Sequence, residues 1–384
     1  NSTVTISIVE ASSDDSFDSL SDQTLTVSTT DDDVAGFTVT ETEGSTSVTE
    51  AGGTDTFNVV LDAQPSSNVV LSISSSDTGE ATVTSLITFT SANWDTAQTV
   101  TVTGVDDDLI DGTISSTLTV AVLDSISDDD FDGVADQTVS VSTTDDDVAG
   151  FTVAETEGST GVDESGTTDT ITVVLNAQPT SDVVIAISSS DTSETAVNGS
   201  TVNNNSLTFT PANWDTAQPF TVTGADDNLV DGTVNSTLTI SVVDALSDNG
   251  FDAVADQTVT ASTTDDDVAG FTVVELDGST GVDESGTTDT FTVVLDAQPT
   301  SDVVITIISS DTGEATVTST LTFTPANWDT PQIATISGVD DDIIDGTVSS
   351  TITISIDDAN SDDDFDAIAD QAVTVSTTDD DVAG

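Results

Sequence analysis

Apolar and polar residues alternate along many short stretches of this 384-residue chain, often with Thr as the polar partner. A period of two places successive side chains on opposite faces of a β-strand. Gly, Pro, Asn, Asp and Ser, which favour turns, separate the stretches, and no helical stripe of apolar residues interrupts them. In the last part of the chain the alternating stretches are 271–275, 290–295, 303–308, 320–324, 333–337, 351–356 and 372–376.

Short strands at this density, with a turn after each, are typical of an antiparallel immunoglobulin-like β-sandwich. The sequence also repeats itself, because Asp-Asp-Asp-Val-Ala-Gly recurs at 31–36, 145–150, 265–270 and 379–384. A repeated unit therefore ends at each motif. We predict an all-β fold with three sandwiches in tandem, forming an elongated rod, at 37–150, 151–270 and 271–384.

Residues 1–36 match only the C-terminal strands of a unit, so we expect them to form a partial repeat. The chain begins at Asn1, in the middle of a unit, which suggests a piece of a longer protein. The missing strands would then come from the preceding chain, or else from another subunit, in which case the chains would polymerise.

The chain has 72 Asp and Glu residues but no Lys, Arg, His or Cys, and its formal net charge is −72. Without cationic side chains it cannot neutralise phosphates or dock to anionic lipid, so nucleic acid and membrane surfaces are excluded as partners. Catalysis by His, Lys or Cys is excluded too, and no apolar run is long enough to insert into a membrane. An apolar content of 35% nevertheless predicts a folded core.

The acids gather in the predicted turns, whereas the strands carry mainly Thr and Ser among their polar residues. Two carboxylates about 4 Å apart repel by about 4 kcal/mol at an effective dielectric constant of about 20, and a small domain is stable by only about 5 to 15 kcal/mol. A divalent cation reverses this repulsion. Ca²⁺ fits Asp-rich loops best, because it accepts about six to eight oxygens in flexible geometry. The alternative, a solvated acidic surface adapted to salt, would scatter acids over the strands.

Several motifs resemble those of the Calx-beta-like sandwich repeats of giant bacterial surface proteins and adhesin extender regions. They are Thr-Phe-Asn-Val-Val-Leu at 56–61, Phe-Thr-Pro-Ala-Asn-Trp at 209–214 and 323–328, Val-Thr-Gly-Val-Asp-Asp at 102–107, and the terminal Asp-Asp-Asp of each unit. The resemblance implies that several Ca²⁺ ions bind at one tip of each sandwich, beside the junction with the next. The ligands it implies are an early Glu, a mid-chain Asp and two Asp runs.

Transferred by position, these ligands are, in the first repeat, Glu50, Asp77, Asp106, Asp107, Asp108, Asp111, Asp145, Asp146 and Asp147. In the second repeat they are Glu164, Asp191, Asp226, Asp227, Asp231, Asp265, Asp266 and Asp267. In the third they are Glu284, Asp311, Asp340, Asp341, Asp342, Asp345, Asp379, Asp380 and Asp381, and the partial repeat has Asp31, Asp32 and Asp33. Asn228 departs from the Asp run, and the family's Glu-rich stretch is shortened, so the number of ions per tip stays open.

A second candidate calcium loop contains Asp128, Asp130 and Asp132 and has the D-x-D-x-D-G start of such loops, without the Glu that normally completes them. The alternative is an acidic hairpin loop without an ion. Related acids recur at Asp14 and Asp18, at Asp248 and Asp252, and at Asp362, Asp364 and Asp366.

Each full repeat has one Trp, namely Trp94, Trp214 and Trp328, which would serve either as a platform for glycans or as an anchor of the core. We expect the anchor, because a large ring in an aromatic-poor unit stabilises most when buried. The Asn-x-Ser/Thr sequons, including two in the inserted loop within 197–210, are frequent by chance in such a composition.

Together these features predict a secreted, extracellular structural protein, the calcium-rigidified stalk of an adhesin or the shaft of a filament, with neighbouring copies as partners. A glycan-binding or calcium-sequestering module is the alternative. A glycosidase with paired carboxylates is disfavoured, because three near-copies of one unit contain no unique pair of acids. We therefore expect no enzymatic activity.

Overall fold

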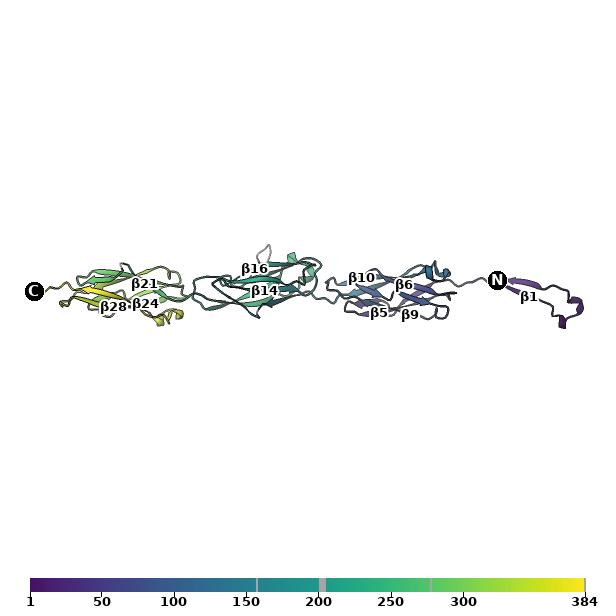
Figure 1. Cartoon of the computed structure of the whole chain (residues 1–384), viewed down its shortest axis with the longest axis horizontal. Coiled ribbons are helices and arrows are strands. Elements are labelled where there is room, and N and C mark those ends of the chain that lie inside the picture. Colours follow the sequence, from purple (N-terminus) through teal and green to yellow (C-terminus); the bar gives the residue numbers. More distant parts are fainter. Residues whose placement is uncertain (157, 200–204, 277, 383–384) are drawn as a thin grey trace. The chain divides into compact units, whose positions relative to one another are not determined.

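A computed structural model describes residues 1–156, 158–199, 205–276 and 278–382 of the chain. It is an all-β structure in which strands are joined by turns and short 3-10 helices (Figure 1). The chain divides into two compact units, Asn1–Asp147 and Val148–Gly384. This division is coarser than the sequence repeats, because the second unit contains two sandwiches that contact each other.

Each sandwich has a four-stranded and a five-stranded sheet. In the first sandwich the smaller sheet has the order β3 (Phe37–Glu41), β5 (Thr54–Leu61), β9 (Gln98–Gly104) and β7 (Ala81–Val83). The larger sheet has the order β4 (Thr46–Thr49), β11 (Gln137–Thr144), β10 (Thr113–Val122), β6 (Val69–Ser75) and β8 (Leu86–Phe89). Neighbouring strands are antiparallel except for β4 and β11, which pair in parallel.

The other two sandwiches repeat this order. In the second sandwich the smaller sheet has the order β12 (Phe151–Glu155), β14 (Thr168–Leu175), β18 (Gln218–Gly224) and β16 (Thr195–Gly199). Its larger sheet has the order β13 (Thr160–Asp163), β20 (Gln257–Thr264), β19 (Thr233–Val242), β15 (Val183–Ser189) and β17 (Ser206–Phe209). In the third sandwich the smaller sheet has the order β21 (Phe271–Glu275), β23 (Thr288–Leu295), β27 (Gln332–Gly338) and β25 (Ala315–Val317). Its larger sheet has the order β22 (Thr280–Asp283), β29 (Gln371–Thr378), β28 (Thr347–Ile356), β24 (Val303–Ser309) and β26 (Thr320–Phe323).

Short 3-10 helices lie in the connection between the last two strands of each repeat. They are η1 (Glu10–Ser12), η2 (Asp15–Phe17), η3 (Asp124–Ile126), η4 (Asp129–Phe131), η5 (Asp244–Leu246), η6 (Asn249–Phe251), η7 (Asp358–Asn360) and η8 (Asp363–Phe365). Across the described part of the chain, no helix has the length and apolar character needed to cross a membrane.

The cores follow from the alternation seen in the sequence. Phe57, Val59 and Leu61 of β5 point inward and are buried, and the residues between them face outward and are partly exposed. Trp94 is partly buried and packs against the core of the first sandwich, as Trp328 does in the third. This placement agrees with the anchoring role expected of Trp94 and Trp328.

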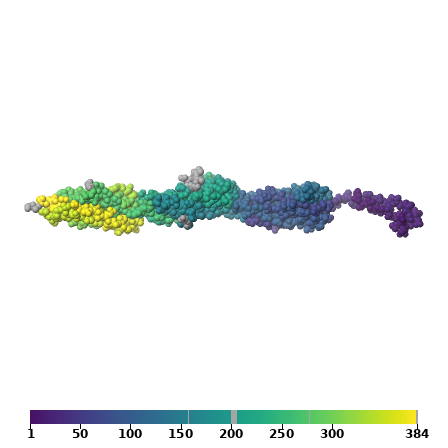
Figure 2. Space-filling view, viewed as in Figure 1, coloured from purple at the N-terminus to yellow at the C-terminus, as the bar shows by residue number. Residues whose placement is uncertain are grey.

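The partial repeat forms only a hairpin of β1 (Ser2–Ile6) and β2 (Gln23–Val27), at the purple end of Figure 2. Its Val4 and Ile6 are 47% and 63% exposed, although their counterparts Leu238 and Ile240 in the second sandwich are fully buried. The hairpin thus has the sandwich pattern without the second sheet that would cover it.

Candidate metal centre

Four chain segments meet at one tip of each sandwich and carry acids there. In the first sandwich, Glu50 directly follows β4, and its backbone N–H donates to Thr144 O at the end of β11 (3.1 Å). Glu80 precedes β7, and its carbonyl oxygen accepts from Val105 N just after β9 (2.9 Å). The loop from β9 to β10 adds Asp111, and the chain after β11 adds Asp145 and Asp147. We call these five acids, and their equivalents, the tip cluster.

A glycine lets these segments approach so closely. A Cβ atom at Gly104, the last residue of β9, would lie 2.0 Å from Thr49 O at the end of β4. The equivalent distances are 2.0 Å from Gly224 to Asp163 O and 2.1 Å from Gly338 to Asp283 O. Since real Cβ atoms do not come this near to a carbonyl oxygen, only Gly allows this approach of β9 to the residue before Glu50.

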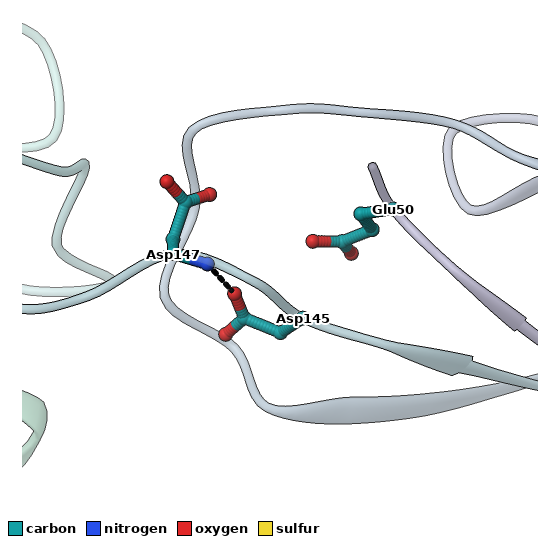
Figure 3. Close-up of side chains that lie close together, drawn as sticks. All are labelled: Glu50, Asp145 and Asp147. Carbon is teal, nitrogen blue, oxygen red and sulfur yellow. Dashed lines mark hydrogen bonds between the residues drawn. The ribbon is translucent and has the colours of Figure 1, made fainter. Parts of the chain in front are cut away.

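Carboxylate oxygens of the tip cluster lie close enough to share a cation. Ligand oxygens of Glu50, Asp145 and Asp147 all lie within 4.8 Å of one another, and so do those of Glu50, Glu80 and Asp111. Figure 3 shows the Glu50 carboxylate pointing toward Asp145 and Asp147. Because both groups include Glu50, the geometry offers two adjacent cation positions. Groups in the second sandwich include Glu164 with Glu194 and Asp231, and Glu164 with Asp227 and Asp267. In the third sandwich one such group is Glu284 with Asp379 and Asp381.

Each of the two glutamates of the cluster is buried and has one carboxylate oxygen without a hydrogen-bond partner. Glu50 and Glu80 are 1% and 6% exposed, and an Oε2 atom of each is hidden from solvent and makes no hydrogen bond. A buried charge left unpaired is costly, and the chain has no cationic side chain to pair with it. The same pattern of hidden, unpaired oxygens recurs at Asp111, Glu164, Glu194, Asp231, Asp267, Glu284, Glu314 and Asp381.

The first Asp of each terminal run is held by the backbone. Asp145 Oδ2 accepts from the N–H groups of Asp111 (3.1 Å) and Gly112 (2.9 Å), while its Oδ1 accepts from Asp147 N (2.7 Å). Gly112 adopts a positive φ of 77°, which suits glycine. The run and the β9–β10 loop are thereby fixed to each other. Asp265 and Asp379 make the same contacts in the other repeats.

Burial and mutual repulsion make Glu50, Glu80, Asp111 and Asp147 hard to ionise. Burial first, and then the charges of Asp107, Asp145, Glu80 and Asp111, together raise the pKa of Glu50 to about 7. Burial and the charges around it likewise raise the pKa of Glu164 to about 7. The same two causes raise the pKa of Glu80, Asp111, Asp147, Glu194, Asp231, Asp267, Glu284, Glu314 and Asp381.

The chemistry of these donors fits a hard cation. Carboxylate oxygens are the ligands that Ca²⁺ prefers, and Ca²⁺ accepts about six to eight of them at about 2.3 to 2.6 Å. A cation between the hidden oxygens would supply the missing positive charge and replace repulsion by attraction. The tip cluster therefore fits Ca²⁺ by burial and by donor type.

The structure brings together part of the ligand set expected from sequence. Glu50, Asp107, Asp111, Asp145 and Asp147 and their equivalents lie in or beside the tip cluster. Other expected ligands, Asp106, Asp108 and Asp146, are exposed, and their charges act on Asp147 from the outside.

Asp77 lies near the cluster and adds to the raised pKa of Glu80 and Asp111. Its Oδ1 atom, however, accepts from Gly79 N (3.0 Å) in a tight turn. Asp191 and Asp311 make the same turn in the other repeats, with Ser193 and Gly313 as donors.

Glu80, Glu194 and Glu314 are cluster members that the sequence reasoning missed. Each follows the expected Asp of the same turn by three residues, at Asp77, Asp191 and Asp311, in all three repeats. This recurring spacing of Asp and Glu is the feature of the sequence that indicates a shared site. Each Glu directly precedes or begins a short strand, so it looked like an ordinary residue of a turn.

At the second candidate loop, Asp128 is already used by the protein. It is 4% exposed, its Oδ2 accepts from Ser66 Oγ (2.8 Å) and Ser67 N (2.7 Å), and its Oδ1 accepts from Asp130 N (3.2 Å). The Ser67 and Ser66 hydrogen bonds lower the pKa of Asp128 to about 2. Asp128 thus anchors η4 to the β5–β6 connection, as Asp248 and Asp362 do for η6 and η8.

Within the first unit, the Asp run of the partial repeat lies near this loop. Asp31 and Asp33 line a hollow of about 400 Å³ together with Gln64, Asp128 and Asp130. Asp31 Oδ1 accepts from Asp33 N (3.2 Å), as the first Asp of the other runs accepts from the third.

No protein-family model matches the chain, and no match was found among curated proteins. Among solved structures, calcium binding domain CBD12 of CALX1.1 is similar, with 15% identity and a TM-score of 0.23, covering 53% of this chain and 80% of that chain. The I-band fragment I67–I69 of titin has 10% identity and a TM-score of 0.28, covering 91% and 98%. Domains 4–9 of surface layer protein SbsC have 19% identity and a TM-score of 0.24, covering 93% and 52%. Similarities this low carry no argument about function.

Proposed function

We propose that this chain is an extracellular structural protein of the Calx-beta-like kind, in which Ca²⁺ bound at the sandwich tips stiffens the array into the stalk of an adhesin or the shaft of a filament. One observation carries the proposal. In each repeat two buried glutamates hold unpaired oxygens against further carboxylates, in a chain without basic side chains. Such a site is unfavourable empty and favourable with a divalent cation.

Two further features support a mechanical function over an enzymatic one. The same acids recur in all three repeats, so no single pair is set apart as a catalytic site. Extracellular calcium modules bind with dissociation constants of about 10⁻⁴ to 10⁻³ M, so they are occupied outside cells and respond to chelators. The partners of such an array would be neighbouring repeats or further copies of the same protein.

Small-angle X-ray scattering and thermal unfolding of the full chain test this proposal together. In a few millimolar calcium we expect a higher melting temperature and a longer, stiffer particle than in excess EDTA, because cations remove the repulsion within each tip cluster. Magnesium at the same concentration serves as the control for ionic strength. If the melting temperature and the scattering curve are the same in calcium and in EDTA, the proposal is wrong.

A further inference from the structure

The loop between Asp227 and Asp231 in the second sandwich connects the tip cluster to the third sandwich. Asp227 belongs to one group of acids with Glu164, and Asp231 belongs to the other. The three residues between these acids, 228–230, form what we call the contact loop. The loop is fixed to its acid, because Asp227 Oδ1 accepts from Leu229 N (2.7 Å).

The contact loop pairs with the third sandwich through its backbone. Gln298 N donates to Asn228 O (2.7 Å), and Val230 N donates to Gln298 O (3.0 Å), so Leu229 and Gln298 form a parallel β-bridge. Val230 also packs against the hydrophobic core of the third sandwich. These contacts lie within the second compact unit of the chain.

A copy of the same loop shows what the contact changes. Ile343 and Ile344 occupy the equivalent positions in the third repeat and are 60% and 59% exposed, whereas Leu229 and Val230 are half-buried. An apolar pair between two acids is thus present in both repeats, and it is covered where it lies against another sandwich.

Charge opposes this contact when no cation is present. The carboxylates whose charges act on Asp231 include Asp364 of the third sandwich. The acids of one sandwich therefore repel the other across the same junction that the contact loop closes. A cation in the tip cluster would remove this repulsion and hold Asp227 and Asp231, the two ends of the loop, in place.

We infer that the contact loop transmits calcium occupancy of the second tip cluster to the junction with the third sandwich. This inference rests on the calcium binding proposed above. With calcium bound, the loop is held in the conformation that pairs with Gln298, and the two sandwiches keep one orientation. Linkage requires the converse as well: the contact with the third sandwich tightens calcium binding at the second tip.

The absence of Cys from the chain allows spin labels to be placed at two chosen positions. Thr208 in β17 and Thr322 in β26 are exposed and equivalent in the two sandwiches. In the full chain carrying T208C and T322C, double electron–electron resonance gives the distribution of distances between the sandwiches. We expect this distance distribution to narrow as calcium chloride is added.

The variant L229S/V230S removes the apolar side chains of the contact loop and leaves every acid in place. In this variant we expect calcium either not to narrow the distance distribution or to narrow it only at higher concentration. The calcium concentration at half-maximal narrowing should then rise about fivefold or more, within the usual range for coupled sites. The matched control I343S/I344S changes the exposed copy of the loop and should leave the width and the midpoint as in the parent. The single variant V230A should give a smaller shift in the same direction.

Calorimetry on the same samples separates the two possible failures. If calcium binds but the distance distribution of L229S/V230S narrows with the midpoint of the parent, the contact loop does not transmit occupancy and the inference is overturned. If no variant and no parent chain binds calcium, the proposed function itself fails.

Discussion

At the scale of single residues, the tip cluster places acids where their charge is least favourable. Glu50 and Glu80 are almost fully buried, and the oxygens they bring together have no hydrogen-bond donor. Asp145 differs, because three backbone N–H groups hold its carboxylate in position. The cluster thus combines carboxylates that the protein orients with carboxylates that it leaves for a cation.

Replacing the three glutamates that the sequence reasoning missed tests their part in this arrangement. In E80Q/E194Q/E314Q we expect calcium affinity to fall about tenfold or more, because one charged ligand leaves each cluster. In EDTA we expect a higher melting temperature than in the parent chain, since a neutral amide does not add to the repulsion. Isothermal titration calorimetry and thermal unfolding measure the two effects.

The matched control for this variant is D95N/D215N/D329N, which removes the same number of charges from exposed, equivalent positions of the three repeats. Equal losses of calcium affinity in the two variants would show that total charge, and not the cluster, binds the cation.

The pH dependence of stability should change sign with calcium. The pKa of Glu50 and Glu164 is raised to about 7 from the ordinary value of 4.5 for Glu, so the folded, metal-free chain holds protons that the unfolded chain has released. Its stability should therefore fall as the pH rises from about 5 to about 8. With saturating calcium the stability should rise over the same interval, because calcium binds the ionised form. Denaturant unfolding at several pH values measures both trends.

The variant E50Q/E164Q/E284Q tests whether these glutamates cause the pH dependence. In EDTA its stability should fall much less between pH 5 and pH 8 than the stability of the parent chain. A metal-free parent whose stability is constant or increases over that interval would contradict the burial of ionisable glutamates at the tips.

At the scale of elements, the tip cluster depends on how closely the end of β9 approaches the end of β4. Gly104, Gly224 and Gly338 permit that approach. The short parallel pairing of β4 with β11 then carries Glu50 to the start of the terminal Asp run. The tip cluster is thus a consequence of sheet topology as much as of the acidic loops.

A methyl group at Gly104 should damage the fold as well as the site. We expect G104A to destabilise the first sandwich by about 1 to 3 kcal/mol, the usual cost of forcing an atom into a packed position, and to weaken its calcium binding. G133A is the control, since nothing lies within 4 Å of a Cβ atom at Gly133. Urea unfolding followed by tryptophan fluorescence compares the two variants, and equal stabilities would show that the close approach is not required.

Most of the sandwich could be predicted from the sequence, because its strands alternate with a period of two over five or more residues. The pattern missed two strands. β25 has only three residues, too few to show a period, and β22 has four, of which Gly281 and Asp283 favour turns. The terminal Asp runs and Glu50 could be placed at one tip by resemblance alone. Glu80 could not, because its burial depends on the neighbouring strands and not on its local sequence.

At the scale of the whole molecule, the sequence has no basic residue that could balance its acids. A net charge of −72 without internal cations leaves the carboxylates of each repeat to be balanced from outside. The clustered part of that charge lies at sites that repeat with the sandwiches, so binding at each tip would act on the array as a whole. Calcium would then determine both the stability of each sandwich and, through the contact loop, the stiffness of the chain.

The most direct test of the central claim is a crystal structure of the chain grown in calcium, with anomalous scattering used to locate the ions. We expect anomalous peaks in each tip cluster, one among Glu50, Glu80 and Asp111 and one among Glu50, Asp145 and Asp147 in the first sandwich, with oxygens at about 2.3 to 2.6 Å. Tip clusters that contain only water, with calcium confined to exposed acids or absent, would contradict the account.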